Sequence, residues 1–223
     1  MVYLKRLNAL KNKKERFELI MDYKLPLFVD YSNKVIVITG AGGVLCSEMA
    51  KAFALCHAKV ALLDLHYSAA EAKAEEIRAL GGIAKGYEAN VLDKDSLEKA
   101  HQTILADFGK CDILINGAGG NSPKASTSQE FYEPKVDSST ISFFDLKTEG
   151  FQFVFNLNIL GTLLPTQVFA NDMLGKEGCS ILNISSMNAF TPLTKIPAYS
   201  AAKAGVSNFT KWLAVHFSHI GIR

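Results

Sequence analysis

The sequence predicts an α/β fold in which helices cover both faces of a parallel β-sheet, a doubly wound three-layer α/β/α arrangement. Short apolar runs alternate regularly with longer amphipathic segments from residue 33 onward. Strands that alternate with helices in this way pair in parallel through crossover connections. The runs are continuously apolar, which is typical of strands that are buried on both faces.

The individual elements follow from the same patterns, in chain order. The apolar runs predict strands at residues 34–39, 59–64, 83–89, 112–116 and 180–185. Helical periodicity predicts helices over residues 47–56, 69–80, 93–108, 144–174 and 198–219. Pro165 lies inside the fourth of these helices and predicts a kink or a break there. Residues 120–143 are rich in Ser, Thr, Pro and Lys and predict a long loop.

Composition and charge exclude several classes of protein. The chain has 223 residues, 48% of them hydrophobic, and a formal net charge of +2. These values fit one globular domain with a sizeable core, and they argue against a disordered chain and a nucleic-acid partner. No uninterrupted apolar run reaches about 18 residues, so we expect no membrane span.

Cysteine and histidine usage gives no sign of a metal site or a disulfide framework. The four cysteines are scattered, form no CxxC pair and predict free thiols in a reducing cytoplasm. There is no HExxH motif, and His216 and His219 have no neighbouring Cys or carboxylate to complete a ligand set. We therefore expect a cytoplasmic protein without a bound metal.

A glycine-rich turn after the first strand points to a phosphate-binding site. The stretch TGAGGVLC covers residues 39–46, between the first strand and the first helix. Such a turn brings backbone N–H groups close to a pyrophosphate, and the helix N-terminus adds partial positive charge, as in Rossmann-like dinucleotide-binding folds. Leu45 stands where GxGxxG has its third glycine, and flavin, nucleotide and sugar enzymes also use glycine turns.

Asp64 ends the second predicted strand and strengthens the dinucleotide interpretation. A carboxylate at this place can accept hydrogen bonds from the adenosine ribose hydroxyls, and it repels the additional phosphate of NADP. No Lys or Arg follows directly, so we expect NAD rather than NADP. A helix-capping role for Asp64 is the alternative, but Ser68 is better placed for it.

Tyr199, Lys203 and Ser186 predict a catalytic end of the site. Residues four apart share a helix face, and an ammonium beside a tyrosine hydroxyl lowers its pKa of about 10 by stabilising the phenolate. A Tyr and a Lys at this spacing also occur by chance on solvated helices. However, Ser186 ends the fifth strand, where ligands of parallel sheets bind, and its hydroxyl can donate to a substrate carbonyl oxygen.

Together these motifs resemble those of the short-chain dehydrogenase/reductase family, from about residue 33 to the end of the chain. The matching features, in order, are TGAGGVL (39–45), Asp64, NGAG (116–119), Asn158 with Gly161, and Ser186 with Tyr199 and Lys203. The resemblance implies hydride transfer between a nicotinamide cofactor and a carbonyl or carbinol carbon. It also implies that residues 33–223 form a dinucleotide-binding catalytic domain, preceded by a loosely held extension over residues 1–32.

The resemblance further implies a role for each residue of the site. Tyr199 would pass the proton, Lys203 would bind the cofactor ribose and tune Tyr199, Ser186 would orient the substrate, and Asn158 would hold a water. The implied cofactor-binding residues are Thr39, Gly40, Gly42, Gly43, Val44, Leu45, Asp64, Asn90, Val91, Asn116, Gly117, Ala118, Gly119, Tyr199 and Lys203.

The chain departs from the family pattern at several positions. Val44 and Cys46 occupy the family's second and third glycine positions, and neighbouring glycines 42 and 43 are expected to compensate. His57 stands where a helix-ending glycine is usual, which costs up to about 1 kcal/mol in the left-handed conformation. Family members continue beyond the position of Arg223 into further strands, so we expect the C-terminal part of the sheet to be missing.

Several stretches are closer to one subgroup of this family, the D-mannonate oxidoreductases, which interconvert fructuronate and mannonate with NAD(H). They are residues 117–127, 143–146, 157–170 and 183–217. A sugar-acid substrate requires polar groups and a cation. We expect Ser186, Asn188 and Lys195 to contact the substrate, with Lys124 as the second candidate for the cation, unless both lysines are solvated.

Two other functions remain open from the sequence. One is the same chemistry on another polyol or keto sugar, such as gluconate. The other is a non-catalytic remnant that binds a cofactor or a partner, suggested by the end of the chain at Arg223. The resemblance also implies a homodimer or homotetramer that pairs the helices over residues 144–174 and 198–219.

Overall fold

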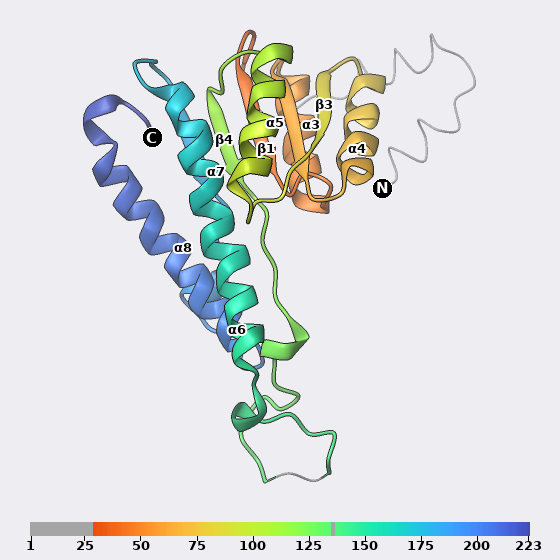
Figure 1. Ribbon diagram of the computed structural model, residues 1–223, viewed down its shortest axis with the longest axis vertical. Coiled ribbons are helices and arrows are strands. Elements are labelled where there is room, and N and C mark those ends of the chain that lie inside the picture. The colour runs from red at the N-terminus through yellow and green to blue at the C-terminus, as the bar shows by residue number, and fades with distance from the viewer. Residues whose placement is uncertain (1–28, 135–136) are drawn as a thin grey trace.

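The computed structural model describes residues 29–134 and 137–223 of the chain (Figure 1). Most of the expected extension over residues 1–32 therefore lies outside the described residues. Within them, strands and helices alternate from β1 to α8, as the sequence predicts.

One parallel sheet forms the centre of the molecule, with its five strands in the order β3-β2-β1-β4-β5. The strands are β1 (Val35–Thr39), β2 (Lys59–Asp64), β3 (Ile83–Glu88), β4 (Ile113–Asn116) and β5 (Ser180–Asn183). At the end of β1, Thr39 lies opposite Leu63 of β2 and Asn116 of β4. The strand order thus reverses between β1 and β4, and open α/β sheets bind ligands outside the carboxyl ends of their strands at such a point.

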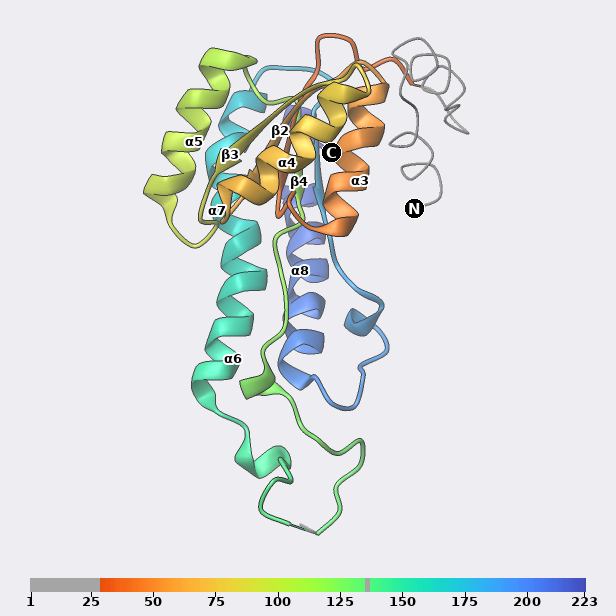
Figure 2. The same cartoon turned by 90° about the vertical axis from the view of Figure 1, so that its right-hand side faces the viewer.

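Helices on both faces of the sheet make two separate apolar cores. The longer helices are α3 (Val44–Leu55), α4 (Tyr67–Ala79), α5 (Lys94–Asp107), α6 (Thr148–Phe155), α7 (Gly161–Phe169) and α8 (Pro197–His216). Ala50 of α3 shares one core with Ile36 of β1, whereas Leu97 of α5 and Phe169 of α7 share the other with Val37. Figure 2 shows α5 and α7 on one side of the strands and α3 on the other. The predicted doubly wound three-layer fold is confirmed.

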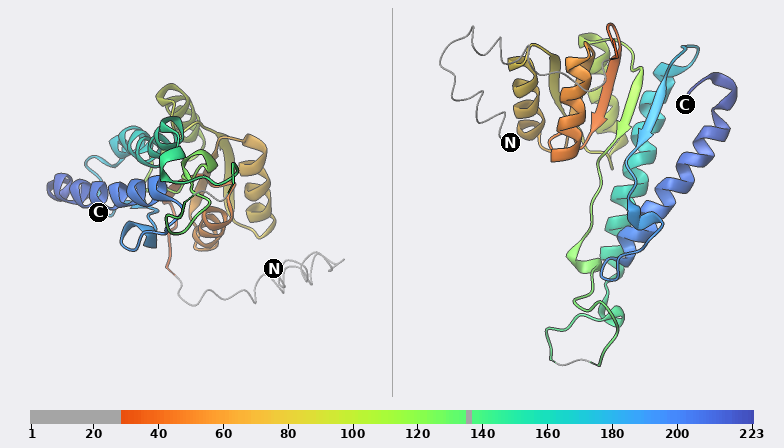
Figure 3. Two further views of the ribbon diagram at one scale, coloured as in Figure 1. Left: turned by 90° about the horizontal axis from the view of Figure 1, so that it is seen from below. Right: turned by 180° about the vertical axis from the view of Figure 1, so that it is seen from behind.

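The segment between β4 and α6 leaves the sheet, and the helical run that begins with α6 returns toward the sheet beside α8 (Figure 1). Over its described residues, 120–134 and 137–143, the predicted loop is confirmed apart from a 3-10 turn at Pro123–Ala125, and a second 3-10 turn lies at Phe143–Asp145. Together with α6 and α8 it extends beyond the ends of the strands (Figures 1 and 3). The backbone N–H of Thr127 donates to the carbonyl of Lys195 at 2.9 Å. This bond joins the loop to the segment that connects β5 with α8.

The predicted long helix over residues 144–174 is observed from Thr148 to Met173, as one helical run whose geometry changes along its length. α6 passes into a π-turn at Asn156–Leu160, then into α7 and a 3-10 turn at Ala170–Met173. Pro165 lies inside α7, which continues through it, so the run has no break there. The change comes earlier because Asn158 Nδ2 donates to the Val154 carbonyl at 2.7 Å, in competition with the backbone ladder.

The same run, Thr148–Met173, is long and apolar enough to cross a bilayer by length and composition alone. However, half of its most apolar window is buried inside the structure. Phe169 and Met173 belong to the core that the run forms with α5 and the sheet. This is the packing of a core helix.

Two local predictions concern thiols and a strained residue. The four cysteines are buried free thiols without a disulfide bond, as predicted: Cys46, Cys56, Cys111 and Cys179. His57 follows α3 with a φ of +69°, so the expected left-handed conformation without glycine is confirmed. In the described part of the chain, no group of three or more His, Cys, Asp or Glu side chains could hold a metal ion.

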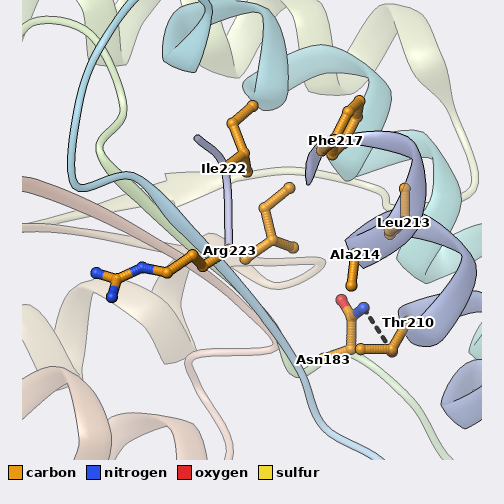
Figure 4. Close-up of a pocket in the computed structure, with 8 residues that line it drawn as sticks. Asn183, Thr210, Leu213, Ala214, Phe217, Ile222 and Arg223 are labelled. Carbon is orange, nitrogen blue, oxygen red and sulfur yellow. Dashed lines mark hydrogen bonds between the residues drawn. The ribbon is translucent and has the colours of Figure 1, made fainter. Parts of the chain in front are cut away.

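β5 lies at one edge of the sheet, beside a small apolar cavity that it shares with α8 (Figure 4). The cavity measures about 50 Å³, far below the range of about 300–1,000 Å³ of ligand pockets. Asn183 Nδ2 donates across it to Thr210 Oγ1 at 2.9 Å. Beside it, the backbone of Arg223 accepts from Ile181 N at 2.7 Å. This cavity is therefore too small to hold a cofactor or a sugar-sized substrate.

Candidate active site

A cavity of about 660 Å³ lies at the carboxyl ends of β1, β2 and β4, where the strand order reverses. Its size is that of ligand pockets, which measure about 300–1,000 Å³. Its lining residues are Gly40, Gly43, Val44, Leu45, Cys46, Asp64, Leu65, Ala89, Asn90, Val91, Leu92, Gly117, Ala118, Gly119, Phe153 and Leu157. The structure thus brings together most residues that the sequence assigns to the cofactor.

The glycine turn between β1 and α3 forms one wall of this cavity. Gly40 has a φ of +67°, and a Cβ there would lie 2.9 Å from the backbone N and Cα of Ala118, so glycine is required. Gly43 is the N-cap of α3 and offers no side chain to the first N–H groups of the helix. These groups, with the partial positive charge of the helix end, suit an anion. Val44 and Leu45 are exposed beside them.

Asp64 lines the cavity and also holds the glycine turn. Its Oδ2 accepts from the backbone N–H of Gly42 at 3.0 Å, and its Oδ1 accepts from that of His66 at 3.1 Å. The N-cap of α4 is His66, without a side-chain bond. The predicted cap at Ser68 is wrong, because α4 already begins at Tyr67.

The exit of β4 forms the opposite wall, through Gly117, Ala118 and Gly119. Thr39 Oγ1 accepts from the N–H groups of Gly117 at 3.1 Å and Ala118 at 3.2 Å. Thr39 is fully buried and does not line the cavity. It therefore supports this wall from behind.

Asn116 is likewise buried beneath the cavity. Its Nδ2 donates to Thr166 Oγ1 at 2.9 Å and to Asn183 Oδ1 at 2.8 Å, which ties β4 to α7 and β5. On the side of β3, Asn90 and Val91 line the cavity directly. The placement of Asn90 and Val91 along the adenine stays a prediction.

Lys203 lies at the boundary between the cavity and α8. It is only 5% exposed, and its Nζ donates to the carbonyl of Ile184 at 2.7 Å. A Cβ on Gly119, which lines the cavity, would lie 3.1 Å from Lys203 Nζ and 2.8 Å from Asn158 Oδ1. Burial lowers the pKa of the Lys203 ammonium. The structure therefore brings Lys203 and Asn158 together at the end of the cavity.

Tyr199 and Asn158 complete the surroundings of this lysine. Lys203 Nζ lies 5.7 Å from the centre of the half-buried Tyr199 ring, one helical turn away on α8. Asn158 is fully buried in the π-turn, and its Nδ2 donates to the Gly120 carbonyl at 2.8 Å. The predicted pairing of Tyr199 with Lys203 on one helix face is confirmed.

Ser186 follows β5 and begins a 3-10 turn at Met187–Ala189 that packs against α8. Its Oγ accepts from the backbone N–H of Asn188 at 3.2 Å, which leaves the hydroxyl hydrogen to donate elsewhere. The preceding Ser185 has a different role, since its Oγ donates to the Lys203 carbonyl at 3.1 Å. The two consecutive serines thus have different roles, one within the turn and one in anchoring α8.

The expected substrate contacts differ in their surroundings. Asn188 is 5% exposed, and its Oδ1 is buried without a hydrogen-bond partner among the described residues. Lys195 is half exposed, with its Nζ 3.8 Å from Glu130 Oε1. Lys124 is exposed on the loop after β4. Of the three side chains, only that of Asn188 is enclosed by the protein.

Sequence reasoning missed part of the cavity lining. Cys46, Leu65, Ala89 and Leu92 are direct neighbours of predicted residues, so extending each motif by one position would have found them. Phe153 and Leu157 come from α6 and the π-turn. No motif marks this last pair, whose place depends on the packing of the long helical run.

Comparisons with known proteins agree with this geometry. The family model for short chain dehydrogenases matches residues 34–223. An uncharacterized oxidoreductase from Haemophilus influenzae is 62% identical over 191 residues, covering 86% of this chain and 67% of that protein. The uncharacterized oxidoreductase UxuB from Bacillus subtilis is 48% identical over 199 residues, covering 89% of this chain and 71% of that protein.

Among solved structures, a Haemophilus influenzae protein described as a candidate D-mannonate oxidoreductase, with bound NAD, superposes with a TM-score of 0.85. It is 61% identical, and the match covers 87% of this chain and 69% of that one. A 3-ketoacyl-(acyl-carrier-protein) reductase from Brucella melitensis, complexed with NADH, has a TM-score of 0.72 at 30% identity, covering 86% and 73%. The chain belongs to the short-chain dehydrogenase family.

Proposed function

We propose that this protein is an NAD-dependent oxidoreductase that interconverts D-mannonate and D-fructuronate, a secondary alcohol and its ketone. One observation carries the proposal: Lys203 Nζ and Asn158 Oδ1 both lie beside Gly119, at the end of the cavity. A glycine turn and Asp64 line the same cavity. The cavity fits NAD in size, in the uncapped N-terminus of α3 and in the carboxylate at its edge. A similar protein binds NAD.

NAD supplies the acceptor of the hydride, and the residues of the chain handle the proton. In oxidation, the ionised oxygen of Tyr199 would take the proton of the substrate alcohol, and in reduction the Tyr199 hydroxyl would return it. Lys203 Nζ lies 5.7 Å from the centre of the Tyr199 ring, so the two side chains can act on the same substrate. Lys203 Nζ uses one hydrogen on the Ile184 carbonyl and keeps two for a ribose hydroxyl. Ser186 would donate to the reacting oxygen, and Asn158 would hold a water for proton exchange with solvent.

Asp64 supports NAD over NADP as the cofactor. Its carboxylate lines the cavity and is held in place by the N–H groups of Gly42 and His66. A fixed negative charge there can accept from ribose hydroxyls and repels a further phosphate. The next residue, Leu65, offers no compensating charge.

A sugar acid is the substrate class that fits the loops around Ser186. Asn188 lies two residues after Ser186 in the same 3-10 turn, and its amide side chain would contact a substrate hydroxyl. Lys195 would pair with the substrate carboxylate, since its ion pair with Glu130 is long and solvent-exposed and therefore weak. Lys124 is the second candidate for this cation.

The test compares substrates and a matched pair of lysine variants. Purified protein with NADH should reduce D-fructuronate faster than neutral keto sugars. Lys195→Ala should raise the KM for fructuronate about tenfold and leave kcat within about twofold, the pattern of lost uniform binding. Lys99→Ala, an exposed lysine on α5, serves as the control. An unchanged KM in Lys195→Ala would exclude Lys195 as the carboxylate partner.

A neutral polyol or keto sugar is the second candidate substrate. One observation favours it: Lys195 already lies near Glu130, so a carboxylate would have to displace that partner. Turnover of a neutral ketose without turnover of fructuronate would support this second substrate. Binding of NADH with no turnover of either substrate would instead favour a non-catalytic role.

The assembly and location of the protein are further parts of the proposal. A homodimer or homotetramer that pairs α6–α7 and α8 is supported by Trp212 and Val215, which are exposed on α8. Light scattering after size-exclusion chromatography measures the state directly. The unbonded buried cysteines suit a reducing compartment such as the cytoplasm.

A further inference from the structure

Cys46 and Gly117 meet between the two walls of the cofactor cavity. Both line the cavity, Cys46 from the first turn of α3 and Gly117 from the exit of β4. A Cβ built on Gly117 would overlap Cys46 Sγ and would lie 2.9 Å from the Thr39 carbonyl oxygen. The thiol therefore already occupies the space in which any side chain at position 117 would begin.

The segments that carry these two residues are in close backbone contact. Thr39 Oγ1 accepts from the N–H groups of Gly117 and Ala118 at 3.1 and 3.2 Å. A Cβ on Gly40 would lie 2.9 Å from the backbone of Ala118. Because both walls are this close, the volume of the side chains between them decides how far apart they stand.

The glycines that precede Cys46 in sequence make their close contacts with other residues. A Cβ on Gly42 would meet Asp64 Oδ2 at 2.9 Å, and one on Gly43 would meet the Gly40 carbonyl oxygen at 3.3 Å. Neither contact involves Cys46. The glycine that faces Cys46 is Gly117, on the other wall.

We propose that Cys46 and Gly117 are a complementary pair of positioning residues that sets the separation of the glycine turn and the β4 exit, and with it the affinity for the cofactor. A thiol at position 46 requires that position 117 carry no side chain, and glycine at 117 leaves a space that the thiol fills. The inference rests on the proposed NAD site.

The thiol acts here as a packing group rather than as a nucleophile. Cys46 is 5% exposed, and burial raises its pKa although the charge of Lys203 opposes this. The group therefore stays neutral at pH 7, and a neutral buried thiol behaves as a small, polarizable apolar side chain.

A double-mutant cycle tests the pair, with wild type, Gly117→Ala, Cys46→Gly and the double variant compared. The readouts are the Kd for NADH by fluorescence titration and the Tm without cofactor. Gly117→Ala should raise the Kd about tenfold, because overpacking moves the walls apart. Cys46→Gly added to it should bring the Kd back to within about threefold of wild type. Cys56→Ala, a buried thiol at the other end of α3, should leave the Kd unchanged.

The outcomes separate this inference from the proposed function. If wild type does not bind NADH, the cofactor site itself is refuted. If wild type binds but the two substitutions act additively, or lower Tm with no change in Kd, the pair has no positioning role. If Gly117→Ala does not fold, a soluble double variant with near-normal Kd supports the pair, and an insoluble double variant overturns it.

Discussion

Lys203 shows how a single residue links two parts of the molecule. It is a buried ammonium, and a buried charge is costly unless hydrogen bonds satisfy it. The Ile184 carbonyl supplies one bond, and the cavity beside Gly119 supplies room for others. The same placement lowers the pKa of Lys203 and keeps its charge near Tyr199.

Removing the phenol hydroxyl is the sharpest test at this scale. Tyr199→Phe should lower kcat about 10²–10⁴-fold, the usual contribution of general acid/base catalysis. The Kd for NADH should stay within about twofold, because Tyr199 does not line the cavity. Stopped-flow or steady-state rates with a fluorescence titration measure both quantities. Retained turnover in Tyr199→Phe would remove Tyr199 from the chemistry.

Most of the residues at the site could be predicted from the sequence, and the exceptions have a common cause. Local spacing in the sequence marks the glycine turns, Asp64 and the Tyr199–Lys203 pair. The contact of Cys46 with Gly117 and the position of Phe153 depend on how distant segments pack. The long separation of these positions in sequence leaves no periodic signal of their contact.

Among the elements, the strands were predicted best because each is a short, continuously apolar run. The predicted and observed β2 coincide at residues 59–64, and β1, β3, β4 and β5 differ only at their ends. Helix ends were harder to place. α3 begins at Val44, before the predicted residue 47. The π-turn was not predicted, because hydrophobic periodicity does not show that the Asn158 side chain donates to the Val154 carbonyl.

Asp112 connects the amino ends of β1 and β4 with the turn before β5. Its Oδ2 accepts from Val35 N at 2.9 Å, and its Oδ1 lies 3.3 Å from Lys34 Nζ and 2.8 Å from Lys176 Nζ. Burial opposes ionisation, but the bonds from Lys176 and Val35 and the two lysine charges outweigh it and lower the pKa of Asp112. The ionised carboxylate therefore stabilises the folded state.

Asp112→Asn should lower the free energy of unfolding at pH 7 by about 1–3 kcal/mol, the usual value of bonds to a charged group. The carboxylate contributes fully above its unfolded-state pKa of about 3.9, and this stability is lost as pH falls through the lowered folded-state value. The difference between wild type and variant should therefore shrink below about pH 4. Urea unfolding at several pH values measures it. A difference that is independent of pH would contradict the assigned charge state.

In the whole molecule, the two faces of the sheet provide stability, and the carboxyl end of the sheet provides the candidate site. Two apolar cores fix the sheet from both sides, and the carboxyl ends of β1, β2 and β4 are left to line the cavity. The alternation of strands and helices was sufficient to predict this architecture, since parallel pairing and crossover handedness leave few topologies. The strand order itself came only from the structure.

A ligand that contacts three strand ends at once should stabilise the whole fold. NADH at about 100 times its Kd should add about 2.7 kcal/mol to the free energy of unfolding. For a chain of this size the corresponding rise in Tm is about 5–10 °C. Differential scanning fluorimetry over a series of NADH concentrations measures it, with NADPH as the comparison. NADPH should give a smaller shift at equal concentration, because the carboxylate of Asp64 repels its additional phosphate. Equal shifts from both cofactors would show that Asp64 does not select between them.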